Sequence, residues 1–226
     1  KLKEWQIKNK ENFDYIILTG DILCLNYPEN DQVEHIAIGE AEISSIISFL
    51  ENMCLNVIYI GGNHDPKSLF DNPDLSLSIK SKNLHKKFHK ISNDLYLFGF
   101  GGSVPTISSK NNFDSENFQP FLDIDNSTMK KITFPGYPYQ NSYEDPDYEK
   151  SDFEFYSDLK KSFEKSKHKI KEENTTENLK FLLLTHNGPF FCQSTIREYR
   201  GKCVYMGSKG LGKFINNNRN DILLNI

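Results

Sequence analysis

Polar side chains with metal-binding chemistry follow three apolar stretches of the sequence. The stretches at residues 57–60, 15–19 and 181–184 run into Gly62-Asn63-His64-Asp65, Gly20-Asp21 and Thr185-His186, respectively. Short apolar runs rich in β-branched and aromatic residues, ended by a glycine turn, predict buried strands. Strands of α/β proteins deliver such turns to one edge of a sheet, where ligands bind. Carboxylate and amide oxygens and imidazole nitrogens are ligands that suit divalent transition metals.

Each of these turns could also be an ordinary polar turn, because Asp, Asn and Gly are common wherever a chain reverses direction. Other candidate sites are weaker. Residues 207–213 fit the G-x-x-x-x-G-K pattern of a phosphate-binding loop, but Phe214 stands where Ser or Thr should bind magnesium. The sequence has no Gly-x-Ser-x-Gly turn for a nucleophilic serine, and no cysteine lies in a recognisable nucleophile context. His85 and His89 could form a metal pair on a helix face, but lysines surround them, and we interpret them as part of a solvated basic face.

The three turns resemble three of the five signature blocks of the calcineurin-like metallophosphoesterases, and they occur in the family's order. The matching residues are Gly20-Asp21, Gly62-Asn63-His64-Asp65 and Thr185-His186-Asn187-Gly188-Pro189. The strand expected at residues 95–100, which ends in Gly101-Gly102-Ser103, is also similar to the family. The resemblance implies a four-layer α/β/β/α sandwich, with two sheets face to face and helices outside.

The resemblance also implies a role for each matched residue. Asp21 would bridge two divalent metal ions, and Asn63 and His186 would bind the second ion through an amide oxygen and a ring nitrogen. His64 would bind no metal but would face the phosphoryl group and stabilise or protonate the transition state. Asp65 would orient His64 by a hydrogen bond to its other ring nitrogen. We therefore expect Asp21, Asn63 and His186 to converge so that one cation could contact all three.

Two signature blocks of the family have no match in this sequence. An Asp-x-His block should precede Gly20-Asp21, and a Gly-His-x-His block should follow the last apolar strand, near Ile226. We interpret the sequence as a single, truncated domain spanning residues 1–226 that lacks its first strand and its C-terminal part. By itself it should hold fewer than two metals.

Two functions of different classes remain open. The first is hydrolysis of a phosphate mono- or diester by a binuclear metal centre, with a metal-bound hydroxide as the attacking group. The second is a non-catalytic scaffold or assembly subunit on the same fold. The intact Asn63-His64-Asp65 favours the enzyme, because a scaffold has no need of an uncoordinated histidine beside a metal ligand. The ligand types suit manganese, iron or zinc, and the identity of the phosphoester stays open.

The rest of the chain predicts strands that alternate with helices. We expect helices at residues 1–12, 33–52, 153–171 and 207–216, and strands at 14–19, 55–60, 95–100, 179–184 and 221–226. Residues 65–82 are expected to be irregular. Residues 111–152 contain four prolines and show neither helical nor alternating periodicity, so we expect an irregular insertion that serves as a lid or as a surface for a protein partner.

Composition excludes several classes of protein. The net charge is −4 with both signs interspersed, which gives no basic patch for nucleic acid. No apolar run approaches the ~20 residues of a membrane span. Residues 1–10 lack the apolar core of a signal peptide, and the four cysteines form no C-x-x-C pair, which is typical of a reducing compartment. We therefore expect a cytoplasmic protein.

Overall fold

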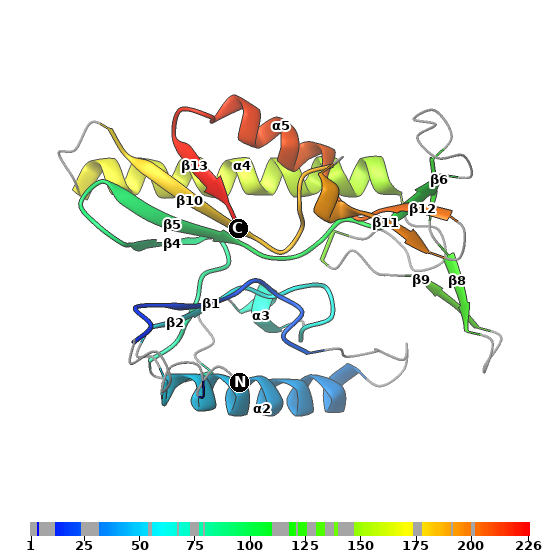
Figure 1. The fold of residues 1–226 in the computed structure, drawn as a ribbon, viewed down its shortest axis with the longest axis horizontal. Helices are drawn as coiled ribbons and strands as arrows, with labels where there is room; N and C mark the ends of the chain where they lie inside the picture. The colour runs from blue at the N-terminus through cyan, green and yellow to red at the C-terminus, as the bar shows by residue number, and fades with distance from the viewer. Residues whose placement is uncertain are drawn as a thin grey trace.

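The computed structural model describes residue 4 and residues 12–23, 32–53, 56–66, 68–72, 77–78, 80–109, 118–120, 122–125, 130–133, 138–139, 147–173, 178–190, 192–199 and 202–226. These residues form stacked layers of helices and sheets (Figure 1). Among the described helices, none is long and apolar enough to cross a membrane.

Two sheets lie face to face at the centre of the molecule (Figure 1). The first is parallel and has the order β1 (Ile16–Leu18), β2 (Val57–Tyr59) and β3 (Lys82–Asn83). The second has the order β13 (Ile222–Asn225), β10 (Lys180–Thr185), β5 (Leu95–Phe100) and β4 (Lys87–Lys90), with β4 antiparallel to β5.

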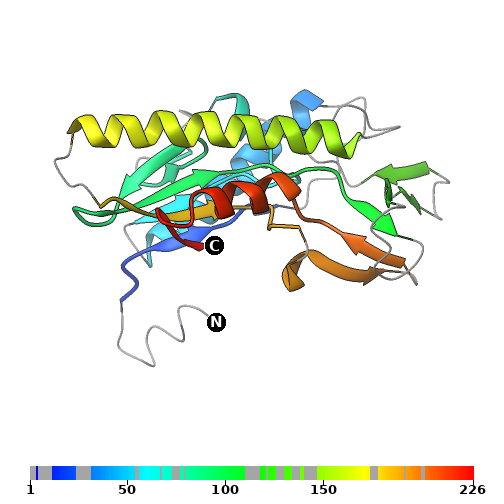
Figure 2. The same ribbon diagram turned by 90° about the horizontal axis from the view of Figure 1, so that it is seen from above.

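Helices cover the outer faces of both sheets. Helix α2 (Gln32–Glu51) packs on the first sheet, and α4 (Tyr148–Glu173) and α5 (Lys209–Asn217) lie side by side on the second (Figures 1 and 2). The mixed α/β architecture therefore agrees with the predicted four-layer sandwich.

Alternation along the strands produces these layers, because successive side chains of a strand point to opposite faces. In β2, Val57 and Tyr59 join the apolar cluster under α2, whereas Ile58 and the following Ile60 join the cluster between the sheets. In β10, Phe181 and Leu183 pack toward α4, and Leu184 packs between the sheets. Strands β2 and β10 are covered on both faces, so these two runs are almost continuously apolar.

Most predicted elements are present with small shifts of their ends. Helix α2 starts one residue before the predicted range and buries Ile43, Ile47 and Leu50 at helical spacing. Strand β5 has the predicted bounds, and β1, β2, β10, β13 and α5 lie within two residues of theirs. The helix predicted at residues 1–12 falls almost wholly outside the described residues.

The prediction of irregular structure was wrong in three places. Helix α3 (Ser68–Asp71) lies within residues 65–82, strand β3 starts at the last residue of that range, and α4 begins at Tyr148 rather than residue 153. Within residues 111–152, three short strands form: β7 (Phe118–Pro120), β8 (Leu122–Asp125) and β9 (Lys130–Thr133). These strands are too short to show alternation in the sequence. Strand β7 pairs with Ile107–Ser109, outside the insertion, whereas β8 and β9 pair with each other.

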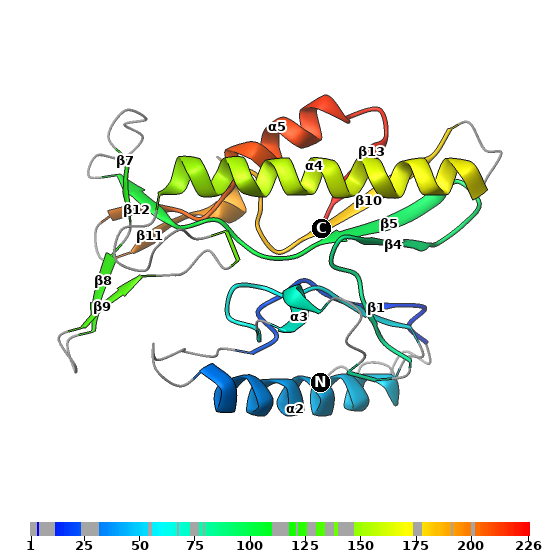
Figure 3. The ribbon, with the colours of Figure 1, turned by 180° about the vertical axis from the view of Figure 1, so that it is seen from behind.

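A smaller antiparallel sheet projects at the end of the molecule where α4 begins (Figures 1 and 3). Its order is β11 (Ile196–Tyr199), β12 (Lys202–Tyr205), β6 (Ile107–Ser109) and β7. A single-turn helix, η1 (Gln193–Thr195), precedes β11, and β8 pairs only with β9 among the described strands.

Candidate metal centre

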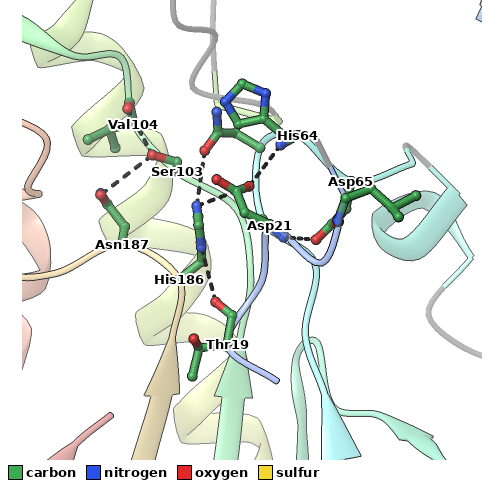
Figure 4. A network of polar contacts seen from close by, with 11 residues as sticks. Thr19, Asp21, His64, Asp65, Ser103, Val104, His186 and Asn187 are labelled. Carbon is green, nitrogen blue, oxygen red and sulfur yellow. Dashed lines mark hydrogen bonds and ion pairs between the residues drawn. The ribbon is translucent and has the colours of Figure 1, made fainter. Parts of the chain in front are cut away.

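Three strand ends from two different sheets meet at one point (Figure 4). Strands β1 and β2 are parallel, with Leu18 opposite Tyr59, so the turns that follow them leave the same edge of the first sheet. His186 follows β10 of the second sheet and reaches across to these turns. Its Nε2 lies 3.0 Å from Asn63 Oδ1 and 3.4 Å from Asp21 Oδ1. The structure thus brings Asp21, Asn63 and His186 together.

The close approach of the turns after β1 and β2 requires glycine at two positions. Gly20 has φ +94°, and a Cβ atom there would lie 2.7 Å from both Gly62 N and His186 Nδ1. A Cβ atom on Gly62 would overlap Asp21 N and Oδ1. Asp21 itself has φ 47°, a left-handed conformation that Asp tolerates better than most residues. Such strained conformations cluster at functional sites.

The imidazole of His186 faces hydrogen-bond acceptors on both sides. Nδ1 lies 3.0 Å from the main-chain oxygen of Thr19, which can only accept, so Nδ1 carries a hydrogen. A neutral ring then presents an unprotonated Nε2 to Asn63 Oδ1 and Asp21 Oδ1. Three acceptor atoms that converge in this way favour a positive charge among them, such as a second proton on the ring or a metal cation.

The charges of the site are coupled. Burial by itself lowers the pKa of His186, but the hydrogen bond and charge of Asp21, followed by the Thr19 carbonyl, outweigh burial and raise it. Burial by itself raises the pKa of Asp21, but the hydrogen bond and charge of His186 and the main-chain amide of His64 lower it overall. The pair therefore favours a carboxylate that faces a positive charge.

His64 contributes its main chain, but not its ring, to the cluster formed by Asp21, Asn63 and His186. Its N–H donates to Asp21 Oδ1 at 3.0 Å, which fixes the carboxylate of Asp21. The imidazole points away from Asp21 and from the carboxylate of Asp65 (Figure 4). The half-buried ring is thus placed beside the cluster without joining it.

The side chain of Asp65 is buried and bonds main-chain groups of both turns. Its side chain is 1% exposed, and its two oxygens accept main-chain N–H groups, from Leu23 at 3.0 Å and from Gly62 at 2.7 Å. Burial raises the pKa of Asp65 overall, although both N–H groups lower it. The predicted orientation of His64 by Asp65 stays a prediction.

Two polar residues beside the cluster were not predicted as site residues. Ser103 Oγ lies 3.1 Å from the main-chain oxygen of Val104 and 3.5 Å from Oδ1 of Asn187, a buried residue (Figure 4). Both residues lie in turns that resemble the family's, Ser103 in Gly101-Gly102-Ser103 and Asn187 in Thr185-His186-Asn187-Gly188-Pro189, and this position could have identified them from the sequence. The sequence could not have identified the main-chain groups of Thr19 and Leu23, because a residue of almost any type supplies such groups.

His85 and His89 do not form a metal pair on a helix. His89 lies in β4, and His85 is 1% exposed between the rings of Phe70 and Phe100. The interpretation of His85 as part of a solvated basic face was therefore wrong. Its Nδ1 accepts the N–H of Gly101 at 3.0 Å, and this bond holds the ring in the core.

The donor set at the site fits one divalent cation. It comprises a carboxylate oxygen, an amide oxygen and an imidazole nitrogen, which suit manganese, iron or zinc. Within the described part of the chain, no group of three His, Cys, Asp or Glu side chains could hold a metal ion. Asn63 is therefore essential to the set, because Asp21 and His186 supply only two donors.

Comparison with known proteins agrees with this geometry. A family model of calcineurin-like phosphoesterases matches residues 2–225. The comparisons found no matching curated protein and no matching solved structure. Because the match spans nearly the whole chain and includes all three strand-end turns, the chain belongs to the calcineurin-like phosphoesterase family, whose members are generally metal-dependent phosphoester hydrolases.

Proposed function

We propose that this protein hydrolyses a phosphate mono- or diester at the site formed by Asp21, Asn63, His186 and His64. One observation supports this most directly: acceptor atoms from three strand ends converge on a single point. A cation there would satisfy Asp21 Oδ1, Asn63 Oδ1 and His186 Nε2 together. When bound, a divalent metal supplies Lewis acidity toward the phosphoryl oxygens and toward water.

The protein's own groups would order this donor set before any ligand binds. The Thr19 carbonyl fixes the hydrogen of His186 on Nδ1 and leaves Nε2 free to bind, a common arrangement for histidine ligands. The N–H of His64 fixes Asp21 Oδ1 from the opposite side. This order reduces the reorganisation that metal binding would require.

His64 would act on the substrate. Its ring is half-buried beside the cluster and points away from Asp21, so it could face a phosphoryl group held at the site (Figure 4). There it would stabilise charge on the phosphoryl oxygens or donate a proton to the leaving oxygen.

A binuclear centre is part of this proposal. Asp21 is the residue proposed to bridge two ions, because a carboxylate has a second oxygen to offer and its charge offsets the repulsion between the cations. Of the residues that the structure describes, Asp21 is the one we assign to both ions.

The proposal is tested by removing the shared carboxylate. Metal-stripped protein is titrated with Mn²⁺, Zn²⁺ and Fe²⁺ in a calorimeter, and hydrolysis of an aryl phosphate monoester and diester is measured. Asp21→Asn should weaken metal binding by at least the ~10–100-fold that loss of a supporting group costs. It should also abolish metal-dependent hydrolysis.

Asp14→Asn is the matched control. Asp14 is an exposed carboxylate just before β1, at the opposite end of the strand from Asp21. This variant should bind metal like the wild type. If wild-type protein binds no divalent metal and hydrolyses neither ester, the enzyme proposal is wrong and a scaffold function is favoured.

A further inference from the structure

The hydrogen bonds between β1 and β2 stop just before the metal centre. The strands pair from Ile16 opposite Val57 to Leu18 opposite Tyr59, and Ile60 N donates to the Leu18 oxygen at 3.1 Å as the last bond of the ladder. Beyond it, both chains turn and carry the ligands. One link beyond this point is the His64 N–H bond to Asp21 Oδ1, which depends on the Asp21 side chain, and a second link must hold the main chains of the two turns together.

Asp65 supplies that interaction. Its Oδ1 accepts the N–H of Leu23 at 3.0 Å, and its Oδ2 accepts the N–H of Gly62 at 2.7 Å. Leu23 lies two residues after Asp21, and Gly62 lies immediately before Asn63. One buried carboxylate thus bridges the two turns that present the proposed ligands, and we call this bridge the clamp.

The carboxylate is also held in place by its own turn. The N–H of Asp65 donates to the oxygen of Gly62 at 3.3 Å, and the side chain is 1% exposed. Bonds between charged and neutral groups are stronger than those between neutral groups, and burial keeps water from competing. The bridge is therefore a rigid connection rather than a surface contact.

We propose that Asp65 is a positioning residue that sets the separation of the Asp21 and Asn63 turns, and thereby metal affinity, rather than one that acts through His64. The ring of His64 points away from the Asp65 carboxylate (Figure 4). This inference rests on the proposed metal site, although its first test does not.

Amide hydrogen exchange of the metal-free protein provides that first test. In Asp65→Asn, the new amide keeps one acceptor oxygen and presents an N–H₂ group to the second main-chain N–H. The exchange rates of Leu23 and Gly62 should rise at least about tenfold, while those of the α4 core stay unchanged. Unchanged rates at both amides would overturn the clamp, whatever the protein's activity.

Asp152→Asn is a control of the same chemistry at a different place. Asp152 is a buried carboxylate on α4 that accepts the N–H of Gly210 at 2.8 Å and the hydroxyl of Ser208. This variant should speed exchange at Gly210 and leave Leu23 and Gly62 unaffected. The control thus distinguishes the effect of losing the Asp65 bridge from the effect of losing any buried hydrogen-bond acceptor.

A double-mutant cycle with His64→Ala then distinguishes the two roles of Asp65. If Asp65 positions the turns, Asp65→Asn lowers metal affinity by ~10–100-fold in both the wild-type and the His64→Ala background. It should also leave the pH profile of kcat unmoved at saturating metal. The opposite result has two parts: Asp65→Asn leaves metal affinity unchanged, and it lowers activity in the wild-type background but not in the His64→Ala background. That result would show that Asp65 acts through His64. If no variant binds metal, the proposed function fails, and the exchange measurement alone decides the clamp.

Discussion

At the scale of single residues, the candidate site is defined by which atom each side chain presents. Nδ1 of His186 donates a hydrogen bond to the Thr19 carbonyl, so Nε2 is the atom that faces Asp21 and Asn63. The neighbouring His64 supplies a main-chain N–H to the same cluster and keeps its ring out of it. The side chains of two adjacent polar residues, Asn63 and His64, thus point to different places because of the turn that carries them.

This difference predicts how a His64→Ala variant behaves. Metal content should stay at the wild-type level, because the N–H that fixes Asp21 belongs to the main chain and survives the substitution. Turnover should fall by about 10²–10³-fold, the usual scale for the loss of one preorganised stabilising group. Metal analysis and steady-state kinetics with an aryl phosphate ester measure the two quantities separately. Full activity, or loss of metal as severe as in Asp21→Asn, would contradict the assigned role.

At the scale of secondary-structure elements, a polar connection joins α4 to the start of α5. Ser208 is the N-cap of α5, and its Oγ accepts the N–H of Leu211 at 2.9 Å while it donates to Asp152. The same carboxylate accepts the N–H of Gly210. Because α5 connects the small sheet to β13, this connection holds the second sheet and the projecting strands in one arrangement.

Removal of the Ser208 hydroxyl should destabilise the protein without changing the candidate metal site. Ser208→Ala loses the helix cap, which costs about 1 kcal/mol, and leaves the buried carboxylate of Asp152 short of a donor, which costs about 1–3 kcal/mol more. Urea unfolding measures the sum. Ser45→Ala, at an exposed hydroxyl on α2, is the control and should change stability by less than about 0.5 kcal/mol. Equal stability of the two variants would show that the connection is unimportant.

At the scale of the whole molecule, the two sheets meet through a buried histidine. His85 lies between β3 of the first sheet and β4 of the second, and its Nδ1 accepts the N–H of Gly101 after β5. The next residue, Gly102, donates to the Gly61 oxygen at 2.9 Å, so the contact reaches the turn that carries Asn63. Burial, with smaller contributions from the charges of Lys86 and Lys87, lowers the pKa of His85 to about 3.

His85 should therefore make the fold sensitive to acid. The unfolded chain binds a proton near pH 6.5, but the folded chain does not until about pH 3, so the free energy of unfolding decreases as the pH falls between these values. The expected slope is about 1.4 kcal/mol per pH unit from this residue. His85→Asn keeps an acceptor for Gly101 but has no proton to gain, so its stability should depend less on pH.

Urea unfolding at about pH 8 and about pH 5 measures this dependence. The His85→Asn variant should lose less stability on acidification than the wild type, even though it starts from a lower value because the ring's packing is lost. His168→Asn, at an exposed residue of α4, should keep the wild-type dependence. Identical pH dependences for His85→Asn and the wild type would mean that His85 is not the group that resists protonation.

The sequence by itself determined the strands that bear the site and the chemistry at their ends. Apolar runs that end in glycine-containing turns marked β1, β2 and β10. Residue type made Asp21, Asn63, His64 and His186 candidate site residues, and the resemblance to the family's signature blocks implied the role of each. These signals are local, because the alternation of a strand and the glycine of a tight turn depend on neighbouring residues.

Only the tertiary structure decided what each candidate contacts. Asp65 bonds the main chain of Leu23, 42 residues away, and His85 is buried although lysines flank it in the sequence. The short strands of residues 118–133 likewise pair without a visible alternation. The physical reason is common to all three: main-chain donors and acceptors carry no residue-specific signal, and burial depends on segments that meet only when the chain folds.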